Sequence, residues 1–254
     1  MFRKTKNNKT KSLATPIMYI SVSIILAISA LQWVKYYYNF DNKKFHFSDT
    51  SILDKRNYAS LLDQISQEEL MKIKLSELNK LIEKHPYVEA ARISNRYPDI
   101  IVIEIMERQP LAILEIDPLT MIDSNGYVLP SKNNFKNIDL PILANTSDLT
   151  NTMNFGEKST SNVINKAVSW LSYIKKYHSP LYKNISELKV SSSDELEIIL
   201  SDYPTKIFLG QKKVKSRINS LLKFEEKLKT NKITDYNYLD LRYDKQIIAM
   251  ERNL

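Results

Sequence analysis

Residues 88–114 read VEAARISNRYPDIIVIEIMERQPLAIL, and this stretch carries the clearest strand pattern in the chain. From Ile100 to Glu107 the side chains alternate between two faces, with the period of two that a β-strand requires. One face holds Ile101, Ile103 and Ile105, and the other holds Val102, Glu104 and Met106. Val88 to Ile93 is a second candidate strand, and Tyr97-Pro98-Asp99 has the composition of a turn. The stretch therefore predicts two strands joined by a turn.

The residues before this stretch predict one more strand and two helices, at Phe45-His46-Phe47, Asp54 to Ile65 and Leu75 to Lys84. In the second helix the leucines and Ile82 form one apolar stripe. That helix is expected to end near His85, because Pro86 disfavours helical geometry in the residue before it. The resulting order is β-α-α-β-β, which predicts a layer of helices over a three-stranded sheet.

After Pro110 short strands alternate with turns, and two helices are inserted. The predicted helices are Asn162 to Tyr177 and Lys212 to Lys229, which place apolar residues at helical spacing. Ser124-Asn125-Gly126 is a hairpin turn, and Asn145 to Ser161 is a polar loop. The strands are Leu111–Ile116, Thr120–Ile122, Tyr127–Leu129, Ile185–Val190, Leu196–Leu200, Lys206–Leu209, Tyr238–Leu241 and Gln246–Met250. The fold class is therefore α+β, with a mixed β-domain that contains two helices.

The N-terminal region contains an apolar run from Ile17 to Val34 without a charged residue. About eighteen helical residues span about 27 Å, close to the hydrocarbon thickness of a bilayer. Aromatic residues gather at its far end, as at a membrane interface: Trp33, Tyr36, Tyr37 and Tyr38. A cleavable signal peptide is the alternative, but the flank Gln32 to Tyr36 is a poor cleavage site. The basic tail predicts a cytoplasmic N-terminus and an exported domain from about Lys35 onward.

Composition and motifs argue against an enzyme or a nucleic-acid-binding protein. The net charge is +8, but five of these charges lie in the first sixteen residues, which leaves about +3 for the rest. There is no cysteine, there are only three glycines, and no phosphate-binding or nucleophile motif occurs. His46, His85 and His178 do not have the spacing of metal ligands. We therefore expect no cofactor, metal, nucleic acid or small-molecule substrate.

Two carboxylate pairs are the remaining catalytic candidates, Glu104 with Glu107 and Asp117 with Asp123. The structural interpretation is favoured for both. Glu104 lies on the polar face of an alternating strand, and Asp123 opens a turn.

The run HPYVEAARISNRYPDIIVIEIMERQPLAIL, followed by MIDSNGYVLP, resembles the FtsQ family of bacterial cell-division proteins, called DivIB in Gram-positive organisms. The near-terminal run from Tyr238 to Tyr243, YLDLRY, resembles another motif of that family. The order and spacing of the motifs carry the resemblance. The residues that match are Pro86, Val88, Arg96, Tyr97, Pro98, Glu107, Arg108, Pro110, Ala112, Asp123, Gly126 and Val128.

The resemblance implies a cytoplasmic tail (1–16), a transmembrane helix with its interface (17–38), a POTRA domain (39–109) and a β-domain (110–254). It also implies a divisome scaffold at the septum, in complex with two small single-pass proteins, FtsB and FtsL. The chain departs from the family at the first POTRA strand, where Val-x-Gly-Asn is common and this chain has Phe45 to Asp49. The boundary of that strand, and any partner contact there, stays open.

The final strand is expected to be a sheet edge, to which a partner adds a further strand. In the resembled family the partner docks there, and the tyrosine that matches Tyr243 contributes. Alternatives inside the chain remain, because Arg242 can pair with Asp240 or Asp244, and Tyr243 can pack in the core. The expected partner-binding residues are Arg242, Tyr243, Lys245, Gln246, Ile248 and Met250.

Two other classes of function stay open. A POTRA-type periplasmic chaperone or translocation component would use the same strand addition, but such proteins usually carry several repeats or a barrel. An anchored periplasmic enzyme would need a cleft with paired titratable groups. The main expectation is therefore a non-catalytic, membrane-anchored scaffold.

Overall fold

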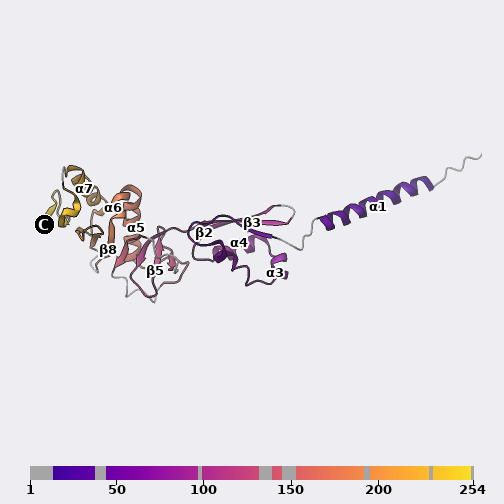
Figure 1. Cartoon of the computed structure of the whole chain (residues 1–254), viewed down its shortest axis with the longest axis horizontal. Coiled ribbons are helices and arrows are strands. Elements are labelled where there is room, and N and C mark those ends of the chain that lie inside the picture. Colours follow the sequence, from indigo (N-terminus) through magenta and orange to yellow (C-terminus); the bar gives the residue numbers. More distant parts are fainter. Residues whose placement is uncertain are drawn as a thin grey trace, which may run out of the picture.

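The computed structural model describes residues 14–37, 44–96, 99–131, 139–144, 153–191, 195–228 and 231–252. Most of the predicted tail, Tyr97 and Pro98 of the predicted turn, and residues 145–152 of the predicted loop lie outside them. In Figure 1 the helix α1 lies at one end of an elongated molecule and the C-terminus at the other. A three-stranded sheet and a nine-stranded sheet lie between them, so the fold is α+β as predicted.

Helix α1 (Ala14–Tyr37) contains an apolar span, Pro16–Val34, with a mean hydropathy of 2.0. None of this span is buried inside the protein. Its serine hydroxyls donate to carbonyls one turn earlier, from Ser21 to Met18 at 2.8 Å and from Ser23 to Tyr19 at 2.9 Å. Such bonds satisfy the hydroxyls without water. The length and polarity of α1 therefore suit a membrane anchor.

The small sheet has the order β1-β3-β2, with β1 parallel and β2 antiparallel to β3. Its strands are β1 (Lys44–Phe47), β2 (Val88–Arg96) and β3 (Ile100–Glu107). Strand β3 has its predicted bounds, whereas β2 is three residues longer than predicted. Residues Phe45 to Phe47, where the sequence departs from the family pattern, form the first strand together with Lys44.

Three helices rather than the predicted two lie between β1 and β2: α2 (Lys55–Ala59), α3 (Gln67–Lys72) and α4 (Leu75–Glu83). The predicted helix from Asp54 to Ile65 was wrong in its length. It ends at Ala59, and a new helix starts after Ser66. Ser66 and Glu69 form a capping box, in which each side chain bonds to the other residue's backbone N–H.

The small core lies between these helices and β3. Tyr58, Leu78, Ile82 and Ile103 are fully buried in it. Met121 and Leu129 of the nine-stranded sheet belong to the same core, and the Tyr87 hydroxyl donates to the Pro130 carbonyl at 2.6 Å. The two sheets therefore pack against one another rather than only following one another along the chain.

The large sheet has the strand order β12-β11-β10-β9-β8-β7-β4-β5-β6. Most neighbours are antiparallel, but β10 with β11, β7 with β8, and β4 with β7 are parallel. Strand β7 was not predicted, because three residues after Pro141 show no usable alternation. The bounds are β4 (Pro110–Leu114), β5 (Thr120–Asp123), β6 (Val128–Pro130), β7 (Ile142–Ala144), β8 (Ile185–Val190), β9 (Leu196–Leu200), β10 (Lys206–Gly210), β11 (Tyr236–Asp240) and β12 (Ile248–Glu251).

Helices α5 (Asn162–Tyr177) and α7 (Val214–Lys227) pack on the large sheet through a common core. Ile174, Leu171, Ile218 and Leu221 are fully buried there. A third helix, α6 (Ser179–Lys183), corrects the prediction of two helices. Its first turn contains Pro180, at a position where a missing N–H costs little. A 3₁₀ helix (Ile233–Asp235) precedes β11.

The carboxylates considered for catalysis do not form pairs. Glu104 is exposed and lies 3.8 Å from the Arg92 guanidinium, on the opposite face of β3 from buried Glu107. Asp123 is buried, accepts from the backbone N–H of Asn125 and pairs with Arg108 at 3.0 Å. Asp117 is exposed whereas Asp123 is buried, and Asp123 holds the hairpin turn after β5.

Candidate functional site

Strand β12 lies at the outer edge of the large sheet, antiparallel to β11. All four of its residues are exposed, and the side chains of Ile248 and Met250 are 40% and 50% exposed. Ile248 pairs with Asp240, and Met250 with Tyr238. An edge strand presents unpaired N–H and C=O groups along its free side. The geometry is therefore open to the addition of a further strand.

The predicted start of this strand at Gln246 was wrong, because β12 begins at Ile248. Gln246 lies in the connection from β11, together with Arg242, Tyr243 and Lys245. Residues 242–247 are hereafter the turn. The six predicted site residues thus divide into four from the turn and two from the strand.

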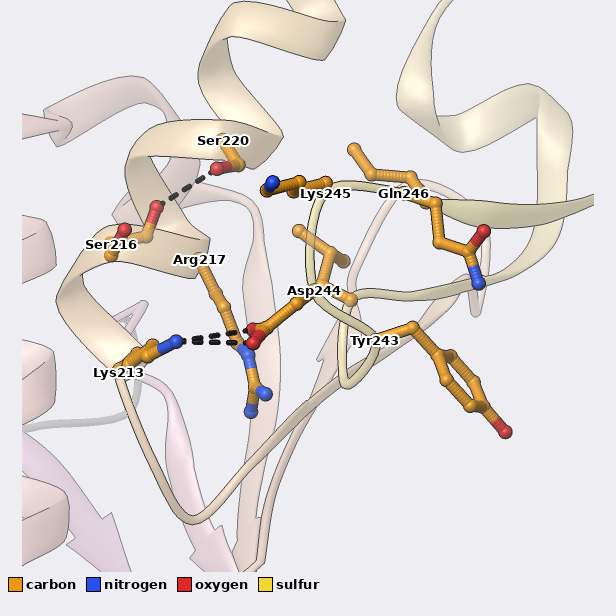
Figure 2. Close-up of a pocket in the computed structure, with 10 residues that line it drawn as sticks. Lys213, Ser216, Arg217, Ser220, Tyr243, Asp244, Lys245 and Gln246 are labelled. Carbon is orange, nitrogen blue, oxygen red and sulfur yellow. Dashed lines mark hydrogen bonds and ion pairs between the residues drawn. The ribbon is translucent and has the colours of Figure 1, made fainter.

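The side chains of the turn point in different directions. Figure 2 shows Asp244 and Lys245 directed towards α7, and Tyr243 directed away from it. Tyr243 is 50% exposed, so it does not pack as a core residue. Lys245 has a φ of 65°, a left-handed backbone conformation that is uncommon for a residue with a side chain. The tight turn therefore carries an exposed aromatic ring and an exposed cation.

Arg242 forms the intrachain pair that the sequence left open, and its partner is Asp240 rather than Asp244. Its Nε and Nη2 donate to the Asp240 carboxylate at 3.0 and 2.7 Å. The guanidinium also lies 5.2 Å from the ring centroid of Phe208 and 3.7 Å from Glu195. This bidentate contact holds the pKa of the Asp240 carboxyl below its ordinary value.

A groove of about 250 Å³ lies between α7 and the turn. Lys213 immediately precedes α7, and its ammonium binds the Asp244 carboxylate of the turn at 3.1 Å, across the groove (Figure 2). Arg217 enters from the first half of α7. Sequence reasoning missed this groove. Lys213 is the N-cap of α7 and Arg217 lies in its first half, but the sequence does not indicate what this end of the helix meets.

Within the described residues no group of three or more His, Asp or Glu side chains is placed to hold a metal ion. His85 packs edge-on against the Tyr58 ring with centroids 4.9 Å apart, and His178 lies 3.2 Å from the Asn219 Oδ1 atom. These two histidines therefore have local packing roles. The site at β12 offers backbone, apolar and basic groups, which suit protein recognition rather than a reaction.

A family model described as FtsQ/DivIB, C-terminal related, matches residues 112–250, more than half of the chain. The chain belongs to the FtsQ/DivIB family. The match covers the whole turn and reaches Met250 in β12. The resemblance predicted from the sequence motifs is thus confirmed.

Individual FtsQ and DivIB proteins are similar over much of the chain. The cell division protein FtsQ of Syntrophotalea carbinolica is 23% identical over 197 residues, which cover 78% of this chain and 69% of that protein. FtsQ of Vibrio cholerae is 28% identical over 194 residues, 76% of this chain and 67% of that protein. DivIB of Clostridium tetani is 32% identical over 118 residues, 46% of this chain and 44% of that protein.

Membership of the FtsQ/DivIB family places this chain among the bacterial cell-division proteins. The apolar helix α1 is consistent with a membrane-anchored division protein.

Proposed function

We propose that this FtsQ/DivIB protein is a bitopic scaffold of the divisome, which binds FtsB-like and FtsL-like partners by strand addition at β12. In this way it helps to assemble and regulate septal cell-wall synthesis. The observation that carries the proposal is the free edge of β12, bordered by the half-exposed side chains of Ile248 and Met250. Main-chain bonds to the edge would supply affinity, and the neighbouring side chains specificity.

The proposed binding surface consists of Arg242, Tyr243, Lys245, Gln246, Ile248 and Met250. Tyr243 contributes a large exposed ring, a residue type that often dominates interface energy. Arg242 is already paired with Asp240, so its proposed role is to present a prearranged guanidinium. Lys245 and Gln246 would border the incoming strand.

The proposed domains follow the two sheets: a POTRA domain over 39–109 and a β-domain over 110–254. The β1-β3-β2 sheet with its helices on one face supports the first, and the nine-stranded sheet supports the second. The proposed topology is type II, with the tail in the cytoplasm and both domains outside, because the basic residues precede α1. Membrane-impermeant protease added to spheroplasts should degrade residues 44–252, and their survival would refute this topology.

Site-specific photo-crosslinking in cells tests the proposed interface. A photoreactive amino acid at Met250 should crosslink to FtsB-like or FtsL-like proteins, identified by mass spectrometry. The same probe at Tyr177 of α5, which is 58% exposed, is the matched control and should not. Equal crosslinking from both positions, or none from Met250, would contradict the edge-strand proposal.

Depletion of the protein separates the classes of function. A division scaffold predicts filamentous cells that lack septa. Outer-membrane defects without filamentation would support a POTRA-type chaperone or translocation component instead, and an accumulated substrate would support an enzyme.

A further inference from the structure

Arg217 joins three elements at the place where the chain leaves β11 for the edge strand. From α7 its guanidinium donates to the carbonyl of Leu209 in β10 and to that of Arg242 at the start of the turn, both at 2.6 Å. A bond between a charged donor and a carbonyl is stronger than one between neutral groups. The two carbonyls are thereby held at fixed positions relative to the helix.

Gly210 makes room for this contact. It has a φ of 62°, and a Cβ atom at this position would lie 2.9 Å from the Arg217 Nη1 atom and 3.1 Å from the Arg242 Cγ atom. Both distances are shorter than ordinary contacts between heavy atoms. One of only three glycines in the chain therefore stands where the two arginine side chains pass each other.

An ion pair between the α7 side and the turn is weaker. The Lys213–Asp244 ion pair has side chains that are 65% and 69% exposed. Exposed pairs of this kind contribute little, because water and salt screen them. Arg217 is half-buried and is also held by its part-buried bond to Leu209, so its bond to Arg242 is the firmer of these two polar contacts. Ile247 of the turn adds an apolar contact to the core that contains Ile218 and Leu221.

We propose that Arg217 is a positioning residue for the partner-binding edge. By holding the Arg242 carbonyl against α7, it sets where the turn begins, on which side Tyr243 projects and where β12 starts. Arg217 acts through the turn and does not itself contact the partner. This inference rests on the proposed function, because it assigns the edge strand a binding role.

Three variants of the full-length protein in its membrane test this role. Arg217→Gln removes the charge and the two-pronged contact. Arg217→Lys keeps the charge, but a single ammonium does not reproduce the planar fork that bonds to two carbonyls. Lys215→Gln is the charge-matched control, because Lys215 lies on the same helix and faces the Tyr173 ring, 5.2 Å from its centroid.

Two measurements are made on each variant: amide hydrogen exchange of peptides from residues 242–251, and the photo-crosslinking yield from Met250. We expect Arg217→Gln and Arg217→Lys to speed exchange about tenfold and to lower the yield severalfold. Lys215→Gln should stay within twofold of the wild type in both. Exchange in α5 should not change in any variant, which separates a local effect from loss of the fold.

The outcomes distinguish positioning from attraction of a charged partner. If Arg217→Lys behaves as the wild type, or Lys215→Gln behaves as Arg217→Gln, then charge rather than position is responsible and the inference is wrong. If the wild type crosslinks from Met250 and Arg217→Gln does so equally well, the inference fails while the proposed function stands. If the wild type does not crosslink from Met250, the proposed function fails, and the binding role of Arg217 fails with it.

Discussion

Replacing Glu107 by Gln tests whether this buried carboxylate holds the small sheet together. Glu107 ends β3 and is 7% exposed. Its Oε2 accepts from the backbone N–H groups of Ser51 and Ile52 at 2.5 and 2.8 Å. Its Oε1 accepts from the Leu53 N–H at 2.9 Å and the Tyr58 hydroxyl at 2.6 Å. One carboxylate thus accepts hydrogen bonds from three backbone N–H groups of the loop between β1 and α2.

The expected cost follows from the number of donors. The NH₂ group of the substituted side chain faces either the N–H groups of Ser51 and Ile52 or the Leu53 N–H, so at least one backbone N–H loses its acceptor, and the remaining bonds lose the charge of the carboxylate. Each hydrogen bond to a charged group contributes about 1.5–3 kcal/mol, so Glu107→Gln should lower the free energy of unfolding by about 3 kcal/mol or more. Glu104→Gln is the matched control on the same strand. Glu104 is exposed and makes only a long ion pair, so this change should cost about 0.5 kcal/mol or less.

The effect of Glu107 should also depend on pH. Burial alone raises the pKa of Glu107, but the bonds from the Tyr58 hydroxyl and the loop N–H groups outweigh it and leave the pKa below the ordinary 4.5. A carboxyl with a lowered folded-state pKa stabilises the fold above the unfolded-state pKa. This contribution is lost as the pH falls through the folded-state pKa. The difference between the wild type and Glu107→Gln should therefore be largest near pH 7 and shrink below pH 4.5.

Hydrogen exchange of peptides from residues 44–107, measured by mass spectrometry at increasing urea concentration, gives the required free energies. The full-length protein in detergent is used at pH 7 and at pH 4. The reasoning is refuted if Glu107→Gln is no less stable than Glu104→Gln at pH 7, or if the difference from the wild type grows at pH 4.

Three further changes have expected outcomes. Arg108→Ala leaves the buried Asp123 carboxylate without its ion pair, so urea unfolding should show a loss of about 3–5 kcal/mol, and a loss below 1 kcal/mol would contradict this. Gly210→Ala should cost about 1–2 kcal/mol by thermal unfolding, because of its positive φ and the short approach to Arg217, and an unchanged melting temperature would argue against that contact. Tyr243→Ala should change stability by about 0.5 kcal/mol or less, because the ring is half-exposed, yet lower co-purification of the partners about tenfold; unchanged co-purification would remove Tyr243 from the proposed interface.

The turn shows how far sequence reasoning reached the candidate site. The final strand was expected to be an edge, and β12 lies at one end of the strand order of the large sheet. The choice of Asp240 over Asp244 as the partner of Arg242 was left open, since both lie two residues away. It depends on the direction in which the chain leaves β11, which places the Arg242 side chain over Phe208.

Two local patterns in the sequence mark helix starts that the prediction did not use. The run Ser66 to Glu69 has the spacing of a capping box, which marks the start of helix α3 that the prediction lacked. Pro180, two residues after His178, marks a helix start in the same way. The short strand β7 had no such signal, because its place depends on parallel neighbours that are distant along the chain.

The sequence by itself determined the elements whose pattern is local. Strands Ile100–Glu107, Ile185–Val190 and Leu196–Leu200 and helix Asn162–Tyr177 have the bounds that periodicity predicted, since alternation and helical spacing depend on neighbouring residues. Only the tertiary structure decided the contacts that join distant residues. Arg217 reaches a carbonyl 25 residues away, and Glu107 bonds to a loop more than 50 residues before it. These contacts follow from how packed sheets and helices bring remote backbone groups together, which no local pattern records.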